Sequence, residues 1–143
     1  MNRREYLQKF VLGGTVLILA PSVLESCTKN NQNPFENPNQ PPSGKTITLD
    51  LNSADYSILK NTGGSKIVQG ILVINTGTGY AALSSICTHQ GCTVGYNSTA
   101  NKIQCPCHGS EFSITGSVIT GPANAPLESF PATLNGTTLE IKT

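Results

Sequence analysis

Charged residues are scarce in this chain and make up 12% of its 143 residues. Tryptophan is absent, and aromatic residues total 6%. Low charge together with 14 glycines and 9 prolines argues against a helix bundle and is typical of a turn-rich β domain. Residues 1–26 hold three of the nine basic and two of the eight acidic residues, which leaves six of each sign in the remainder. This balance offers no basic patch, so we expect no nucleic-acid partner and no broad electrostatic steering.

The chain also lacks an apolar run long enough to be an obvious membrane span. Its N-terminal run "VLGGTVLILAPSVL" has 14 residues, which is the length of a signal-peptide core and short for a span. The preceding "NRREYLQK" resembles a twin-arginine export signal, and "LESC" at Leu24–Cys27 resembles a bacterial lipobox. We therefore predict a signal over residues 1–27 with Cys27 as the lipidation site.

Two other interpretations of this N-terminal run remain. An uncleaved anchor helix would leave Cys27 as an incidental thiol. A buried core helix is disfavoured by Gly13, Gly14 and Pro21 and by the lack of a polar face. Both a cleaved signal with a lipid on Cys27 and an uncleaved anchor helix would place the functional part on the outer face of a bacterial membrane, where disulfides persist.

The rest of the sequence divides into a tether, residues 28–44, and a folded domain, residues 45–143. The tether is rich in Asn, Gln and Pro and has too little apolar surface to offset its ordering entropy. In the domain, apolar alternation and turn dipeptides predict antiparallel strands, with hairpin turns at residues 76–79, 115–116 and 135–136. Pro131 indicates an edge position. Little of this part has a helical period, and no internal repeat is evident.

Most of the cysteine and histidine side chains lie in two short segments, "SICTHQGC" at residues 85–92 and "QCPCHGSEF" at residues 104–112. Together these segments contain four of the five cysteines and both histidines. Cys87-x-His89 and Cys105-x-x-His108 can each bring two donors to one point. Two cysteines and two histidines are also a zinc set. Zinc fingers usually pair like with like on one element, whereas each segment here offers one thiol and one imidazole. That suits a two-iron cluster in which one iron takes both thiolates and the other both imidazoles.

The two segments resemble the two-box signature of Rieske [2Fe–2S] proteins, and the flanking "GYAALSSI" and "GPANAPL" are also similar to that family. The resemblance implies one Rieske-type [2Fe–2S] cluster, thiolate ligands from Cys87 and Cys105, and imidazole ligands from His89 and His108. It also implies an all-β, Rieske-like antiparallel β-sandwich with a cluster-binding subdomain inserted at about residues 85–126.

The resemblance accounts for the remaining pair of cysteines as well. Cys92 and Cys107 match the disulfide of the respiratory-type members, and residues 121–126 match the proline loop that covers the cluster. Ser110 matches a hydroxyl that donates to a bridging sulfide. Phe112 stands where high-potential members carry a tyrosine, so we expect a reduction potential below that of members with both hydroxyls. Gln90 replaces a leucine of the mitochondrial-type quinol-oxidising proteins.

The resemblance implies one-electron transfer, as an electron-transfer subunit of an oxidoreductase rather than an enzyme by itself, with no catalytic residue of its own. The first hypothesis is a membrane-tethered component of a quinol-oxidising, cytochrome bc-like respiratory complex, with a cytochrome b or c type partner and quinol. The alternatives are the small subunit of an exported oxidoreductase of the arsenite oxidase kind, paired with its large subunit, and a standalone periplasmic carrier. Ring hydroxylases and their ferredoxins are disfavoured because they lack the Cys92 and Cys107 pair.

Overall fold

The computed structural model describes residues 40–143, and the predicted signal with Cys27 lies outside them. The described part contains eleven strands and one short 3₁₀ helix, which confirms the all-β prediction. In chain order the elements are β1 (Thr46–Asp50), η2 (Ser57–Lys60), β2 (Ser65–Val68), β3 (Ile71–Asn75), β4 (Tyr80–Ser84), β5 (Gly95–Asn97), β6 (Lys102–Gln104), β7 (Glu111–Phe112), β8 (Val118–Thr120), β9 (Ser129–Phe130), β10 (Ala132–Asn135) and β11 (Thr138–Lys142). None of the helical segments within residues 40–143 is long and apolar enough to cross a membrane.

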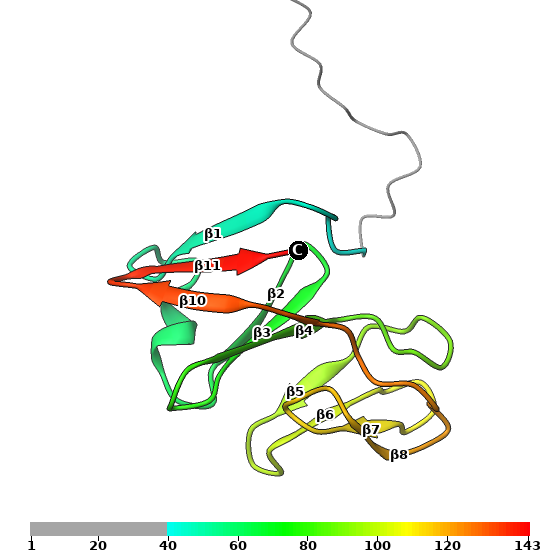
Figure 1. Ribbon diagram of the computed structural model, residues 1–143. Coiled ribbons are helices and arrows are strands. Elements are labelled where there is room, and N and C mark those ends of the chain that lie inside the picture. Colours follow the sequence, from blue (N-terminus) through cyan, green and yellow to red (C-terminus); the bar gives the residue numbers. More distant parts are fainter. Residues whose placement is uncertain (1–39) are drawn as a thin grey trace, which may run out of the picture. The chain divides into compact units, whose positions relative to one another are not determined.

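The strands form three antiparallel sheets (Figure 1). The first has the order β1-β11-β10, and the second β2-β3-β4-β9. The third sheet, β5-β6-β7-β8, is built from the chain between β4 and β9 and therefore interrupts the second sheet in sequence. Figure 1 shows it below the other two. This connectivity places both Cys/His segments in the inserted part.

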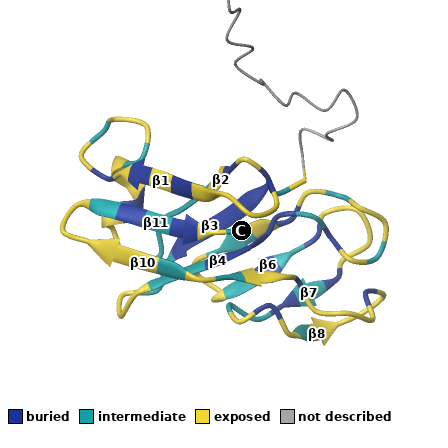
Figure 2. Cartoon of the chain, turned by 45° about the horizontal axis from the view of Figure 1, so that its top comes forward, coloured by how far each residue is buried: buried dark blue, intermediate teal, exposed yellow. Residues whose placement is uncertain are grey.

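Strand β3 is buried on both faces because it lies in the middle sheet. Its residues Ile71 and Val73 belong to one apolar core, shared with β1 and β11. Leu72 and Ile74 belong to a second core, shared with β6 and β7. The unbroken apolar run of this strand follows from that position, since a strand covered on both faces has no side that must be polar. Figure 2 shows β3 in the buried colour and β10 largely exposed.

The exposure of β10 agrees with the edge position that Pro131 indicates. Strand β10 pairs only with β11 among the described residues, and Pro131 directly precedes it. The turn between β10 and β11 contains Gly136 with φ +62°, a conformation that glycine adopts without strain.

The 3₁₀ helix η2 was not expected, because a single turn carries no readable helical period. Tertiary contacts hold it instead. Leu59 is fully buried, and its carbonyl accepts hydrogen bonds from Asn75 Nδ2 at 2.8 Å and from the Tyr80 hydroxyl at 3.0 Å. Asn75 ends β3 and Tyr80 begins β4, so this turn is fixed by residues distant in sequence.

Candidate metal centre

Two loops carry the Cys and His side chains, and their backbones follow the same hydrogen-bond pattern. In loop 1, Cys87–Cys92, the Gly91 N–H donates to the Cys87 carbonyl at 2.9 Å, and the Cys87 N–H donates to the Cys92 carbonyl at 2.7 Å. In loop 2, Cys105–Ser110, the corresponding bonds join Gly109 to Cys105 at 3.1 Å and Cys105 to Ser110 at 2.8 Å.

The equivalent glycines of the two loops, Gly91 and Gly109, have φ +74° and +75°. This left-handed backbone favours glycine. The two loops are therefore a local structural repeat, which the sequence analysis did not detect. The two copies carry different side chains at equivalent positions. His89 of loop 1 corresponds to Cys107 of loop 2, and Gln90 of loop 1 corresponds to His108 of loop 2.

Each loop begins with a buried free thiol. Cys87 is 2% exposed and Cys105 3% exposed, and both belong to the apolar core under the third sheet. Burial raises the pKa of the Cys87 thiol, and the hydrogen bond and charge interaction with Cys105 raise the pKa further. Two adjacent buried thiols of this kind become thiolates when a cation is bound between them.

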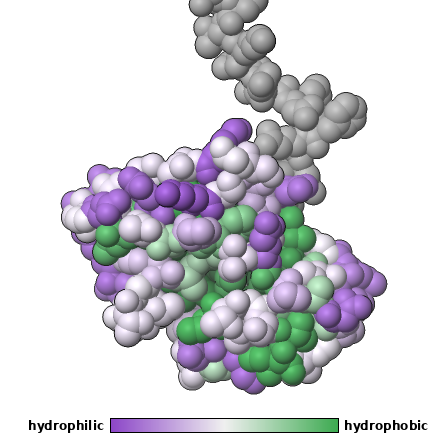
Figure 3. Space-filling model, viewed as in Figure 1, coloured by the Kyte–Doolittle hydropathy of each residue, from purple (hydrophilic) through white to green (hydrophobic). Residues whose placement is uncertain are grey.

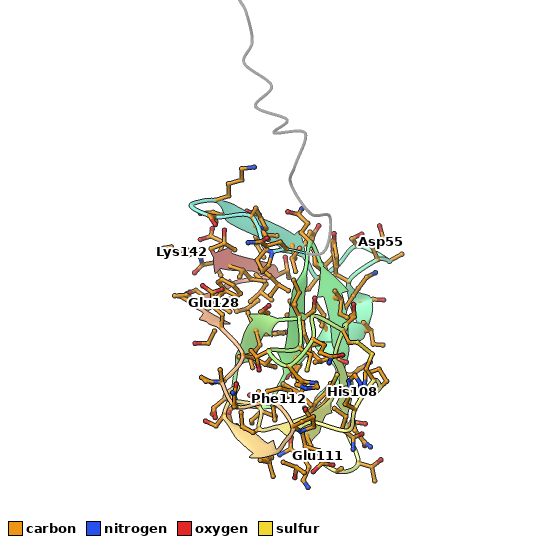
Figure 4. All side chains as sticks on the ribbon, turned by 90° about the vertical axis from the view of Figure 1, so that its right-hand side faces the viewer. Asp55, His108, Glu111, Phe112, Glu128 and Lys142 are labelled. Carbon is orange, nitrogen blue, oxygen red and sulfur yellow. A yellow bond between two sulfur atoms is a disulfide. The ribbon has the colours of Figure 1, made fainter. Side chains whose placement is uncertain are left out.

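The two imidazoles also lie together. The rings of His89 and His108 are 4.9 Å apart between centroids and meet edge to face at 85°. His108 is exposed and His89 is half-buried. His89 Nδ1 is nevertheless buried and has no hydrogen-bond partner among the described residues. A buried nitrogen left without a partner is unfavourable, so this atom indicates a missing ligand. Figure 4 shows His108 in the same part of the molecule as Phe112 and Glu111.

The remaining pair of cysteines joins the two loops. Cys92 and Cys107 form a disulfide with an S–S distance of 2.01 Å, as the resemblance implied. Both sulfurs lie within 4.8 Å of the Cys105 sulfur. Because two of these three sulfurs form the disulfide, Cys105 is the only one of the three that could bind a metal. The bridge instead fixes the separation of the loops that present the free thiols.

The proline loop, residues 121–126, is hydrogen-bonded to both metal-site loops. The Thr88 hydroxyl of loop 1 donates to the Ala125 carbonyl at 2.6 Å. The Ser110 hydroxyl of loop 2 accepts from the Ala123 N–H at 3.0 Å. Ser110 is fully buried and makes no other side-chain hydrogen bond within residues 40–143, so its own proton is free to be donated.

The residues present fit an iron–sulfur cluster. Two buried thiols, an unpartnered buried imidazole nitrogen and a second imidazole form the donor set of a mixed thiolate and imidazole site, and Ser110 of loop 2 has a free hydroxyl proton. Phe112 is fully buried in the same apolar core as both thiols and offers no hydroxyl. Sequence reasoning missed the bond from Thr88 and the acceptor role of Ser110, since neither partner is near in sequence. The fold and the donor set together define a cluster-binding, all-β electron-transfer protein.

Comparisons with known proteins agree with this class. The family model of the Rieske [2Fe-2S] domain matches residues 39–131. The chain is 33% identical over 144 residues to the cytochrome b6-f complex iron-sulfur subunit of Chlorobaculum thiosulfatiphilum, covering 98% of this chain and 75% of that protein. It is 36% identical over 134 residues to the same subunit of Chlorobaculum tepidum, covering 90% of this chain and 68% of that protein.

A solved structure is similar as well. The crystal structure of the cyanobacterial plasma membrane Rieske protein PetC3 from Synechocystis PCC 6803 matches with a TM-score of 0.53 and 33% identity. The match covers 61% of this chain and 93% of that one. The chain belongs to the Rieske [2Fe–2S] family, and its cofactor is one [2Fe–2S] cluster.

Proposed function

We propose that the chain carries single electrons as the Rieske component of a membrane-bound, quinol-oxidising complex. The observation that carries this proposal is the joint placement of two buried thiols and two imidazoles on disulfide-linked loops. Two relatives that match this chain over 98% and 90% of its length are subunits of cytochrome b6-f complexes, which supports a cytochrome partner.

The roles of the individual side chains follow from their burial. Cys87 and Cys105 would hold the cluster through their thiolates from the apolar core. His89 would hold it through its unpartnered Nδ1, together with the exposed imidazole of His108. When bound, the cluster would supply a one-electron couple. The exposed His108 ring can then pass a proton to or from quinol at the surface.

The cluster-binding part is nearly uncharged, which bears on how a partner would recognise it. Between residues 85 and 126 the only Lys, Arg, Asp or Glu side chains are Lys102 and Glu111. These two form an ion pair at 3.0 Å. In Figure 3 hydrophilic residues appear on both the upper and the lower part of the molecule, and apolar surface appears near β8, where Ile119 is 48% exposed. A docking partner would therefore present an uncharged surface rather than a charged patch.

Metal and sulfide analysis combined with electron paramagnetic resonance (EPR) tests the ligand assignment. Purified protein should contain two irons and two acid-labile sulfides per chain, and the reduced form should give a Rieske-type EPR signal. His108→Ala should abolish this signal, whereas Lys102→Ala, a nearby change outside the donor set, should keep it. One zinc without sulfide would contradict the assignment.

The partner is tested in the native membrane. The complex isolated through a C-terminal affinity tag should contain haem b and be reduced by quinol. A molybdopterin in its place would favour the arsenite oxidase-like alternative. Isolation of the chain without either cofactor would favour a standalone carrier. Placement on the outer membrane face, with a lipid on Cys27 as tether, is part of the same proposal and has its own test below.

A further inference from the structure

A row of polar side chains crosses the outer face of the third sheet, with one member from each strand. Asn97 of β5 donates through Nδ2 to Gln104 Oε1 of β6 at 3.2 Å. Gln104 Nε2 in turn donates to Glu111 Oε1 of β7 at 3.1 Å. Thr120 of β8 reaches Glu111 Oε2 at 3.5 Å, and Lys102 Nζ contacts the same oxygen at 3.0 Å.

The carboxylate of Glu111 determines which amide groups in this row donate and which accept. An ionised carboxylate only accepts hydrogen bonds. Gln104 must therefore turn its NH₂ group toward Glu111, and its carbonyl oxygen then faces Asn97. The side-chain amides of Gln104 and Asn97 therefore each have a single orientation that satisfies these hydrogen bonds. Lys102 and Gln104 together lower the pKa of Glu111, which keeps the carboxylate ionised at neutral pH.

The central pair of the row stands at the base of loop 2. Gln104 directly precedes Cys105, and Glu111 directly follows Ser110. Gln104 and Glu111 are opposed in the β6–β7 register, which contains only one other pair, Ile103 and Phe112. The ladder on the far side of β7 is irregular between Glu111 and Phe112. Backbone pairing alone thus gives loop 2 a short and irregular support.

The two residue pairs of β6 and β7 act on opposite faces of the sheet. Ile103 and Phe112 are fully buried in the core that holds the thiols. Gln104 and Glu111 face the other way, where they line a hollow that also includes Pro106 and Gly109 of loop 2. The Gln104–Glu111 hydrogen bond is therefore a side-chain link between the two strands at the base of loop 2, in addition to the backbone bond from Cys105 to Ser110.

We infer that Gln104 and Glu111 are positioning residues for the cluster, since their hydrogen bond holds loop 2 in the conformation that presents Cys105, His108 and Ser110. This inference rests on the proposed cluster ligation. Neither residue belongs to the proposed donor set, and both act through the backbone of the loop between them.

Two variants separate the hydrogen bond from the charge. Gln104→Ala removes the bond and leaves the Lys102–Glu111 ion pair in place. Glu111→Gln removes the charge, and its amide oxygen can still accept from Gln104. Glu140→Gln in β11 is the control for loss of a carboxylate far from the third sheet. The full chain with its cluster is measured by EPR, by voltammetry and by the rate of cluster loss to a chelator.

Gln104→Ala should alter the EPR line shape and lower the potential, because Ser110 is held less well as a donor. Its cluster should be lost about tenfold faster than in the wild type, the change expected for the loss of one hydrogen bond. Glu111→Gln should keep the wild-type line shape and should not lower the potential, and Glu140→Gln should change none of the three measurements.

A Gln104→Ala protein with the wild-type EPR spectrum and potential would overturn the inference, whatever its rate of cluster loss. A spectral change of equal size in Glu111→Gln would also overturn it, because charge rather than the bond would then be responsible. A wild-type protein without a Rieske-type signal would overturn the proposed function and this inference together, so the two failures are distinguishable.

Discussion

Replacing Ser110 with alanine removes a hydroxyl that has two separate tasks in the proposed site. Its oxygen accepts from the Ala123 N–H at 3.0 Å, which ties the proline loop to loop 2. Its proton is free to be donated to a sulfur of the cluster. Ser110 is fully buried and Ala123 is 4% exposed, so water cannot easily replace either partner. The variant should therefore have both a lower free energy of unfolding and a lower reduction potential.

The two losses can be given rough magnitudes. A buried N–H left without an acceptor destabilises the fold by on the order of 1–3 kcal/mol. A hydrogen bond to the cluster stabilises the more negative, reduced form preferentially. If that preference is about 1–2 kcal/mol, its loss lowers the potential by about 40–80 mV, because a tenfold change in a one-electron equilibrium is about 59 mV and about 1.4 kcal/mol.

The assay is voltammetry of the wild type and Ser110→Ala at one pH, with denaturant unfolding of the same samples. Ser85→Ala is the matched control, because Ser85 is also buried and its hydroxyl already donates to the Gly70 carbonyl at 2.9 Å. The control should lose some stability and keep its potential. A wild-type potential in Ser110→Ala would refute the donation. A wild-type stability would show that the Ala123 N–H finds another acceptor.

Four further predictions follow from the structure and the sequence. Cys92→Ser should lower the free energy of unfolding by about 3 kcal/mol, since the bridge spans 15 positions, and should leave the iron ligands unchanged; equal denaturation midpoints would contradict this. Phe112→Tyr should raise the potential in voltammetry, and an unchanged value would mean that this buried ring does not face the cluster. The pKa of Glu111 in the folded state is lowered from 4.5, so the ionised carboxylate stabilises the fold above about pH 4.5, and this stabilisation is lost as pH falls through the lower folded pKa. Glu111→Gln should lack this acid-dependent loss in unfolding titrations. A pH profile identical to that of the wild type would argue against the ion pair. Cys27→Ser should release the protein from membranes on fractionation, whereas retained attachment would favour the uncleaved-helix alternative.

Much of the fold could be predicted because its signals are local. Alternation of Ile47, Leu49 and Leu51 within residues 45–51 predicted a half-buried strand, and the structure contains β1 there with Ile47 and Leu49 buried. The Asn135-Gly136 dipeptide predicted the final hairpin, which the structure contains with its turn one residue later, at Gly136 and Thr137; Gly136 supplies the positive φ of this turn. The turn η2 was missed because a single turn has no period and depends on contacts with Asn75 and Tyr80.

For the site, the sequence determined the chemistry. Two Cys/His segments with this spacing contain every proposed donor, and the resemblance they carry implied the Cys92–Cys107 pairing that the structure contains. Residue types and short spacings are properties of the chain itself, so they can be read before any fold is known.

Only the tertiary structure decided how the donors are held. It buried Cys87 and Cys105 in one core, left His89 Nδ1 without a partner among residues 40–143, and brought the proline loop to Ser110. It also showed that the two loops share one backbone pattern. These features join residues that are far apart in the sequence or depend on hydrogen bonds of the backbone, which every residue carries alike. No pattern of side chains could have indicated them.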